Sequence, residues 1–271
     1  MAQKDIWKLQ SEVIDWLRFP LIVLVVYIHN QGKGILPVEE IDWSFPRGLD
    51  FYSWISYSLR SVLGSIAVPS FFVISGYFFF LKVKEWNITV YKEKLRSRFK
   101  TLLIPYILWN IITLSAPVIW HLSLAWHNPQ HITDLNNYLS DIDSFHWIWD
   151  SHLAPLTGKE VNWLGIFHQM TYPINVPMWY IRDLMVMVLL SPAVYWLAKH
   201  LLHYYLLILL TLSLIGLWPN IHGFKDTTAL YFSIGAYCGI NKINMLQLVR
   251  RIEIPNRTVS IVPTASFRFF S

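Results

Sequence analysis

Residues 101–121 read TLLIPYILWNIITLSAPVIWH, and no Asp, Glu, Lys or Arg interrupts them. A helix needs about 20 mainly apolar residues to cross the hydrocarbon core of a bilayer, so this stretch predicts a transmembrane helix. Five further segments are predicted as spans, at 14–30, 53–81, 177–198, 201–219 and 227–240. The predicted fold class is therefore all-α: a polytopic transmembrane helix bundle with about six spans.

The composition independently favours a protein that lies in lipid. Hydrophobic residues make up 54% of the chain and charged residues 14%, and the mean hydropathy of +0.38 lies outside the range of soluble globular proteins. A basic stripe with interleaved aromatic residues, the usual mark of nucleic-acid binding, is absent from the sequence. Cys238 is the only cysteine, which excludes a disulfide framework or a cysteine metal site within one chain.

Lysine and arginine are distributed unevenly between the segments that join the predicted spans. Residues 82–100 hold seven of them, whereas the longer segment 122–176 holds only Lys159. Cytoplasmic loops carry the excess of these residues. The N-terminus and residues 82–100 are therefore predicted to face the cytoplasm, and residues 122–176 to face outward. Residues 82–100 either only set this topology or also bind an anionic cofactor.

Histidines are scattered through the outward segment and its start, at His121, His127, His131, His146, His152 and His168. They do not fall into tight ligand spacings with cysteine or carboxylate, so no bound metal is expected. Trp147, Trp149 and Trp163 lie beside polar residues, which suits an interfacial cap or a sugar-facing surface, and the cap is favoured.

Ionisable residues inside spans are expensive in lipid and mark functional sites by default. Arg18 and His29 lie eleven residues apart in the first span. At about 100° and about 1.5 Å per residue they point the same way to within about 20°, roughly 16 Å apart along the axis. Pro20 suits the first helical turn, which would put Arg18 at or just before the regular start. Such an Arg and His form either a structural pair or a catalytic one.

The predicted topology sorts the polar residues of the spans into two levels. The cytoplasmic level comprises Arg18, Ser75, Gly76, Tyr77, Arg98, Lys100, Pro105 and Tyr106. The outer level comprises His29, Arg60, Arg182 and Asp183.

Arg182 and Asp183 are neighbours on one predicted helix. Adjacent positions point about 100° apart, so these two side chains are not expected to satisfy each other. Each then needs its own partner inside the bundle. Asp183 would orient the imidazole of His29, or it would neutralise Arg60 or an arginine of a helix that this chain lacks.

Several motifs occur in order along the predicted helices. They are Asp15-Trp16-Leu17-Arg18 followed by ten residues and His29, PSFFVISGY at 69–77, RFKTLLIPY at 98–106, WYIRDL at 179–184 and YFSIG at 231–235. This series resembles the acyltransferase-3 family of integral membrane O-acyltransferases, which includes acetyltransferases of cell-surface polysaccharides. The resemblance covers about residues 11–240. The family has about ten helices, whereas this chain supplies about six.

Two features depart from the family pattern. Thr101 stands where many members have the second arginine of an Arg-x-x-Arg motif, so Arg96 and Lys100 are expected to share the anchoring of phosphates. Residues 243–271 show no family likeness and no further span. The predicted organisation is a partial membrane acyltransferase domain at 1–242, with 122–176 as its outward-facing segment, followed by a tail that reads as a C-terminal truncation.

The resemblance implies transfer of an acyl group, commonly acetyl, from coenzyme A to a hydroxyl of a cell-envelope or exported polysaccharide at the cell inner membrane. The expected partners are an acyl-CoA (acetyl-CoA) co-substrate, a polysaccharide or lipid-linked glycan acceptor and membrane lipid, with no metal and no nucleic acid. Expected cofactor-binding residues are Arg18, Ser75, Gly76, Tyr77, Arg98 and Lys100.

The catalytic candidates are His29, Arg182 and Asp183. Neutral His29 would act as general base on the acceptor hydroxyl, and a nearby cation, Arg182 or Arg60, would stabilise the tetrahedral oxyanion. A covalent acyl-enzyme on His29 or Ser75 is a second mechanism, although Ser75 lies at the wrong level for it.

Two other function classes share much of this pattern. A transporter or flippase for glycans or lipid-linked sugars would have similar spans, buried charges and an outer aromatic segment. It would have no use for an arginine-to-histidine spacing that matches the pantetheine arm of coenzyme A. An inactive fragment or assembly partner would fit the smaller number of helices.

Overall fold

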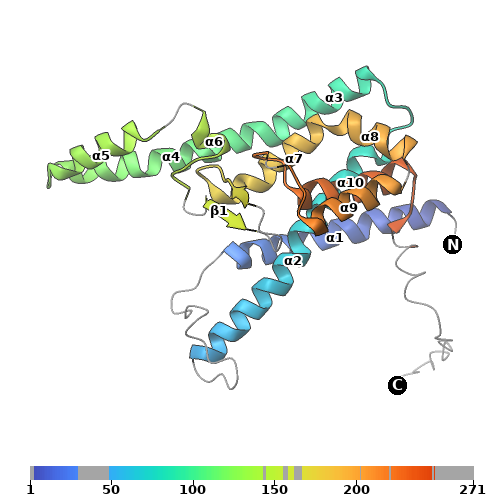
Figure 1. Cartoon of the computed structure of the whole chain (residues 1–271), viewed down its shortest axis with the longest axis horizontal. Coiled ribbons are helices and arrows are strands. Elements are labelled where there is room, and N and C mark those ends of the chain that lie inside the picture. The colour runs from blue at the N-terminus through green and yellow to red at the C-terminus, as the bar shows by residue number, and fades with distance from the viewer. Residues whose placement is uncertain are drawn as a thin grey trace, which may run out of the picture.

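The computed structural model describes residues 3–29, 49–142, 145–154, 158–161, 167–201, 203–219, 221–245 and 247. The long helices α1 (Gln3–His29) and α2 (Leu49–Leu81) pack on each other near the centre of the molecule (Figure 1). The other helices are α3 (Ile88–Arg98), α4 (Ile104–Ala125), α5 (Gln130–Ser140), α6 (His146–Trp149), α7 (Trp179–Leu189), α8 (Ser191–His200), α9 (Tyr204–Ile215) and α10 (Asp226–Ile240). Each segment predicted as a span is largely helical where the structure describes it.

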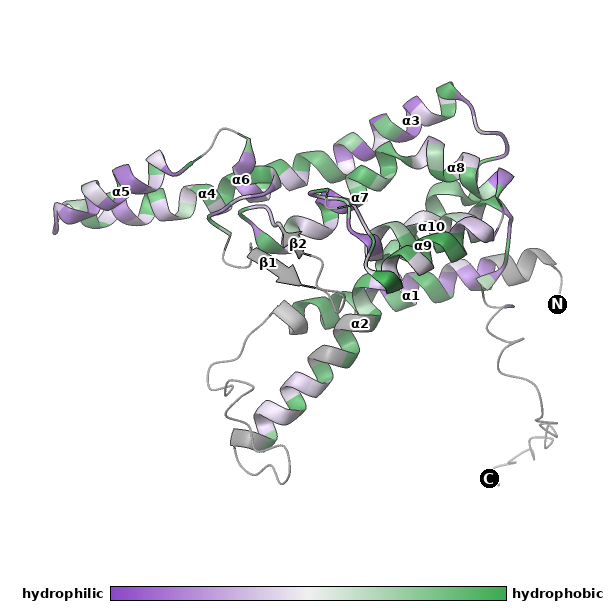
Figure 2. Ribbon diagram, viewed as in Figure 1, coloured by the Kyte–Doolittle hydropathy of each residue, from purple (hydrophilic) through white to green (hydrophobic). Residues whose placement is uncertain are grey.

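One continuous helix in the described part is long and apolar enough to cross a bilayer. It runs over Ile88–Ala125, through α3, a π-helical turn (Phe99–Leu103) and α4. Only 11% of its most apolar window is buried inside the molecule, and α4 is largely apolar along its length (Figure 2). Such a surface suits lipid better than water.

The predicted span 177–198 is broken. Residues Val176–Leu189 and Ser191–His200 together meet the same length and apolarity test, but they are bent by 60°. Pro192 lies in the first turn of α8, where its missing N–H and its ring prevent α7 from continuing straight. The described residues therefore hold one or two clear membrane-span candidates, and the number of six stays a prediction.

The first helix is longer than the sequence suggested. It begins at Gln3 and contains Pro20 in its interior, so Arg18 does not lie at the start of the helix, as the position of Pro20 had indicated. A proline inside a helix removes one backbone hydrogen bond and is tolerated in membrane helices, where neighbouring groups satisfy the freed carbonyl. Arg18 and His29 therefore belong to one helix.

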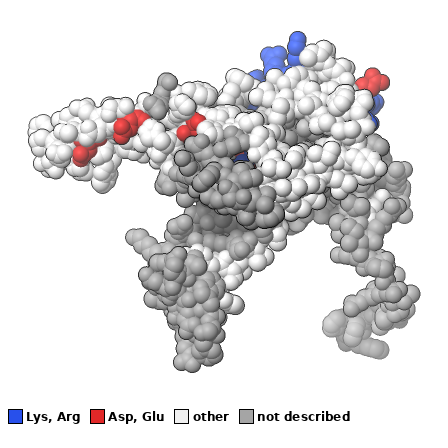
Figure 3. Space-filling view, viewed as in Figure 1, with Lys and Arg blue, Asp and Glu red and all other residues white. Residues whose placement is uncertain are grey.

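Residues 82–100, expected as a loop between spans, are mostly helical. Asn87 caps α3, because its side-chain carbonyl accepts a hydrogen bond from the Val90 backbone N–H at 2.9 Å. In Figure 3, Lys and Arg side chains cluster at the α3 end of the molecule, with an acidic group beside them, whereas the other acidic side chains in view lie along the arm that α4 and α5 form. Positive charge on this face is thus concentrated at the α3 end of the molecule.

The closest helix contact joins α2 and α10. A Cβ atom added to Gly235 would lie 1.9 Å from the Val73 carbonyl oxygen, and one added to Gly76 would lie 2.1 Å from the Phe232 carbonyl oxygen. Small residues let membrane helices approach this closely, and Gly235 and Gly239 have the Gly-xxx-Gly spacing typical of such contacts. Gly235 faces Val73 and Tyr77 whereas Gly239 faces Tyr77 and Leu81, so the two helices run parallel.

The segment 122–176 contains the exception to the all-α prediction. Strands β1 (Gly158–Val161) and β2 (Phe167–Met170) pair antiparallel, with Gly158 opposite Met170. Strands of four residues are too short for a periodic pattern to reveal, which is why the sequence did not predict them. The same segment folds back over α4, where the Tyr106 hydroxyl donates a hydrogen bond to the Ile148 carbonyl oxygen.

Candidate active site

Basic side chains surround one turn of α2. The Arg18 guanidinium carbon lies 5.4 Å from the centre of the Phe78 ring, and that of Arg98 lies 6.0 Å from the centre of the Phe79 ring. The Lys94 ammonium lies 4.8 Å from the same Phe79 ring and donates to the Phe79 carbonyl oxygen. Cations over aromatic faces are attracted by the ring quadrupole. Arg18 and Arg98 therefore lie at one level of the molecule.

The predicted cofactor-binding residues differ in what they contact. The Ser75 hydroxyl lies 3.3 Å from the Tyr180 hydroxyl on α7, and Arg98 interacts electrostatically with the same tyrosine. Arg18 is half exposed and pairs with Asp15 at 2.9 Å. Lys100 is exposed on the π-helical turn. Cationic and hydroxyl groups that suit an anionic ligand thus approach α2 from different helices, Arg18 from α1 and Arg98 and Tyr180 from α3 and α7.

Gly76 and Tyr77 serve packing contacts. Gly76 is where the backbones of α2 and α10 meet. Tyr77 is fully buried, and Gln10 of α1 donates a hydrogen bond to its hydroxyl at 2.6 Å. Both residues thus contact neighbouring helices. Their role in cofactor binding stays a prediction.

A buried ion pair lies on α7. The Arg182 Nε donates to Asp183 Oδ1 at 3.0 Å, and a terminal guanidinium nitrogen lies 3.0 Å from the same oxygen. Both side chains are 0% exposed. The expectation that these neighbours could not satisfy each other was wrong, because the long arginine side chain folds back across the angle between two adjacent helical positions.

Further partners complete the hydrogen bonding of this pair. Arg182 Nη1 donates to the Trp149 carbonyl oxygen, and Nη2, which also lies near Asp183, donates to the Thr171 carbonyl oxygen. Asp183 Oδ2 accepts a hydrogen bond from the Thr228 hydroxyl at 3.2 Å. A buried charge needs such partners, since an unpaired one is strongly destabilising. The pair therefore ties α7 to α10 and to the outward segment.

His29 and Arg60 were the partners proposed for Asp183. His29 is the last residue of α1, but the side chains of His29 and Arg60 lie outside the residues whose side chains the structure describes. The prediction that His29 acts beside Arg182 and Asp183 therefore stays a prediction.

The two charged sites lie at different levels of α2. Gly235 lies opposite α2 between Val73 and Tyr77, and Thr228, which holds Asp183, is seven residues earlier on the parallel helix α10. Phe78 and Phe79, which hold the cations, come a few residues later on α2. The sites are then about ten residues apart along α2, or roughly 15 Å at about 1.5 Å per residue.

Tyr106 does not lie at the level that the sequence predicted. Its hydroxyl contacts Ile148, whose neighbour Trp149 provides a carbonyl to Arg182. Tyr106 therefore belongs to the level of the ion pair, not to that of Arg18 and Arg98. Residues 122–176 thus extend back along α4 as far as its first turn. The positions of apolar and polar segments in the sequence do not reveal such a contact.

A second charged group lies next to this pair. The Asp150 carboxylate bridges two imidazoles, with His146 Nδ1 2.6 Å from Oδ1 and His222 Nδ1 2.6 Å from Oδ2. The Trp149 indole donates to the His222 carbonyl oxygen at 3.1 Å. Asp150 thus fixes the loop after α9 against α6.

Sequence reasoning missed most partners of the ion pair. The Trp149 and Thr171 groups that accept from Arg182 are backbone carbonyls, which any residue type provides, so no sequence signal marks them. Thr228 is one of many hydroxyl residues in the spans. The WYIRDL motif marks the charged residues themselves but not what surrounds them.

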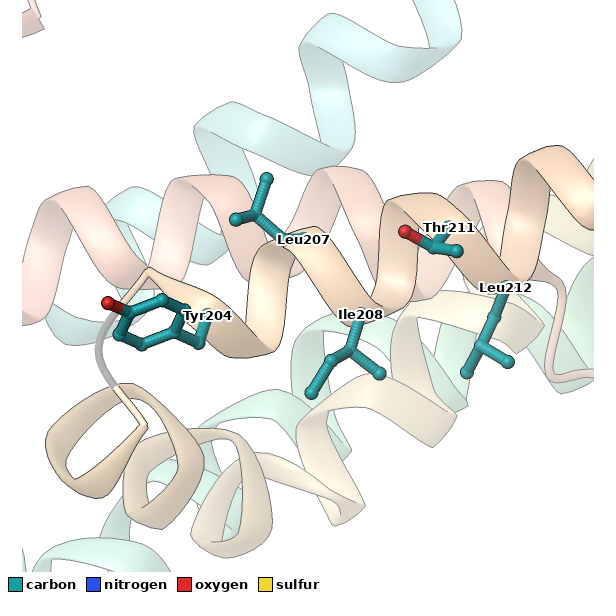
Figure 4. A pocket seen from close by; sticks show the side chains of 5 residues that line it. All are labelled: Tyr204, Leu207, Ile208, Thr211 and Leu212. Atoms are coloured by element: carbon teal, nitrogen blue, oxygen red, sulfur yellow. The ribbon is translucent and has the colours of Figure 1, made fainter.

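A surface depression on the described part of the chain is apolar. Tyr204, Leu207, Ile208, Thr211 and Leu212 line a shallow depression on one side of α9 (Figure 4). Tyr204, Leu207 and Ile208 are exposed. Their apolar side chains suit lipid or another helix, not a charged substrate.

Comparison with known proteins agrees with the motifs. The family described as an acyltransferase domain, acyltransferase 3, matches residues 12–253. The chain belongs to this family. It is also 26% identical over 244 residues to the succinoglycan biosynthesis protein ExoH of Rhizobium meliloti (strain 1021). That match covers 89% of this chain and 57% of the relative, so the chain spans little more than half of that protein. No solved structure matches.

Proposed function

We propose that this protein transfers an acyl group, in our view acetyl, from coenzyme A to a hydroxyl of a cell-envelope or exported polysaccharide. Family membership supports the reaction class, and a relative named for succinoglycan biosynthesis supports a polysaccharide as acceptor. The observation that carries the proposal is the separation of a cationic level from a buried charged level along α2. The cationic level suits the phosphates of coenzyme A, and the level of the buried ion pair suits the thioester group that reacts.

The donor side is assigned to the turn of α2 that carries Phe78 and Phe79. Arg18 and Arg98 approach this turn from α1 and α3, and Lys94 and Lys100 add positive charge. Guanidinium groups bind phosphate oxygens in bidentate fashion, whereas lysines act as point charges. Coenzyme A bound here would direct its pantetheine arm toward the outer level, along the roughly 16 Å between Arg18 and His29 on α1.

The reacting side is assigned to His29 as general base. A neutral imidazole within hydrogen-bond reach of the acceptor hydroxyl would take its proton as the hydroxyl attacks the thioester carbonyl. The bonds of Arg182 to Asp183 and two carbonyls occupy most of its donors. We therefore give Arg182 and Asp183 a positioning role, and Arg60 is the remaining cation proposed for the oxyanion.

A transporter or flippase of glycans or lipid-linked sugars is the competing function. It would also bury charges and expose aromatic side chains outside the membrane. It would not need to bind coenzyme A. Donor binding therefore separates the two functions.

We expect the N-terminus and α3 to face the cytoplasm, in a multi-pass protein of the inner membrane. Positive charge gathers on α3, and cytoplasmic segments carry that excess. Single cysteines at Lys92 and Lys159, in a protein whose Cys238 is replaced by serine, would be treated with an impermeant thiol reagent. In intact cells position 159 should react and position 92 only after lysis. The opposite pattern would reverse the topology and the donor assignment with it.

Removing Arg18 and Arg98 should weaken coenzyme A binding. A hydrogen bond to a charged group is worth about 1.5–3 kcal/mol, so each arginine should contribute about tenfold or more in affinity. Binding of coenzyme A to purified protein would be titrated by calorimetry at two salt concentrations, because a phosphate site near the surface weakens with salt.

Lys92→Ala is the matched control for this measurement, since Lys92 is an exposed cation of α3. It should leave the affinity near the wild-type value. A folded Arg18→Ala/Arg98→Ala protein that binds coenzyme A as tightly as wild type would remove the donor assignment. A wild-type protein that binds none would favour the transporter.

A further inference from the structure

The helices α4 and α5 form an antiparallel hairpin at one end of the molecule (Figure 1). The Tyr138 hydroxyl donates to the Leu114 carbonyl oxygen at 3.1 Å, and His131 of α5 lies beside His121 of α4. At the tip, the Asn128 side chain accepts from the Gln130 backbone N–H at 3.0 Å. The hairpin thus brings residues from two helices into one place.

Three metal-ligating side chains meet on this hairpin. The Nδ1 atoms of His121 and His131 lie 3.2 Å apart, and Asp134 Oδ2 lies 3.8 Å from His131 Nδ1. One ligand atom from each of the three residues lies within 4.8 Å of the others, and all three side chains are partly buried. No other group of three or more His, Cys, Asp or Glu in the described part of the chain meets this criterion.

The spacing fits a tetrahedral ion. With zinc–nitrogen bonds of about 2.0–2.1 Å, two ligands of a tetrahedral ion lie about 3.3 Å apart. The observed 3.2 Å between the two Nδ1 atoms agrees with this value, and the Asp134 carboxylate, 3.8 Å from His131 Nδ1, would move closer to bind the same ion. Two imidazoles this close cannot both carry a proton at Nδ1 without repulsion. Either one Nδ1–H donates a hydrogen bond to the other Nδ1, or a divalent cation bound to both nitrogens replaces that proton.

We propose that His121, His131 and Asp134 form a binding site for a divalent transition-metal ion of the Zn²⁺ class. Imidazole and carboxylate ligands suit Zn²⁺ and its neighbours better than Ca²⁺ or Mg²⁺, which prefer oxygen donors. The ion links α5 to the end of α4 and stiffens the outward segment that also supplies carbonyls to Arg182. Three protein ligands leave the fourth position of the ion for water. This inference does not depend on the proposed acyl transfer.

Metal binding by the purified chain tests the proposal. The protein would carry an affinity tag without histidine, be treated with a chelator and be titrated with Zn²⁺ by calorimetry. We expect one tightly bound Zn²⁺ per chain, and a rise in melting temperature because the ion binds the folded hairpin. His131→Ala, His121→Ala and Asp134→Asn should each weaken binding by at least about tenfold. Loss of a residue that only supports a metal ligand costs about 10–100-fold in affinity, and loss of the ligand itself should cost no less.

The control is His127→Ala, because His127 is an exposed histidine at the tip of the same hairpin. It should bind Zn²⁺ like wild type. Asp134 is partly exposed, so Asp134→Asn keeps the test decisive if a histidine variant misfolds. The proposal is wrong if wild type binds Zn²⁺ no tighter than folded Asp134→Asn, or if His127→Ala weakens binding as much as His131→Ala.

Discussion

His29→Ala should lower acyl transfer by about 10²–10⁴-fold, the usual contribution of a positioned general base. Coenzyme A binding should survive, because Arg18, the cation of α1 assigned to the donor, lies roughly 16 Å from His29 along the helix, and Arg98 belongs to α3. Activity of the wild type should also rise with pH through the titration of an imidazole, since the protonated form cannot accept the hydroxyl proton. The measurement is transfer from labelled acetyl coenzyme A to envelope glycan by the full-length protein.

A purely structural His29 predicts a different result. In that case His29→Ala would lower expression and thermal stability, and His29→Gln would restore both stability and transfer by keeping a hydrogen-bonding side chain. Melting curves on the same preparations separate the two cases. A folded His29→Gln enzyme with near-normal transfer would end the general-base assignment. Absence of transfer by wild type would instead favour the transporter.

Features that depend on local pattern were predictable from the sequence. Apolar runs near bilayer length placed helices in all six predicted spans, and the Tyr231 to Gly235 motif marked the helix that packs most closely on α2. The length and hydrophobic periodicity of an apolar segment do not show where its helix bends. The predicted span 177–198 bends after α7, where Pro192 lies in the first turn of α8. Short strands carried no pattern long enough to read.

Features that depend on tertiary contact were not predictable in this way. The carbonyls that hold Arg182 come from Trp149 and Thr171, 33 and 11 residues away in the chain. His121 and His131 are too far apart in sequence for a tight ligand motif, and only the turn between α4 and α5 brings their rings together. Sequence spacing finds sites within one element, whereas these sites lie between elements.

Breaking the buried pair on α7 should strongly destabilise the protein. Arg182→Met removes the guanidinium that pairs with the Asp183 carboxylate and donates to two carbonyls, and loss of one partner of a buried ion pair costs about 3–5 kcal/mol. Arg182→Lys should rescue little, because a single ammonium cannot replace a planar guanidinium that bonds in several directions. Thermal melts of the purified variants, with exposed Lys92→Ala as control, measure the effect.

The double variant Arg182→Met/Asp183→Leu separates the ion pair from its surroundings. It removes both charges together, so its destabilisation should be smaller than the sum of the single variants by a coupling of about 0.5–3 kcal/mol. The Trp149 and Thr171 carbonyls still lose their donor, so the double variant should remain less stable than wild type. If the pair only positions α7, a double variant that still folds should keep part of its acyl transfer. Strictly additive effects of the two single variants would show that the pair is not coupled in the folded protein.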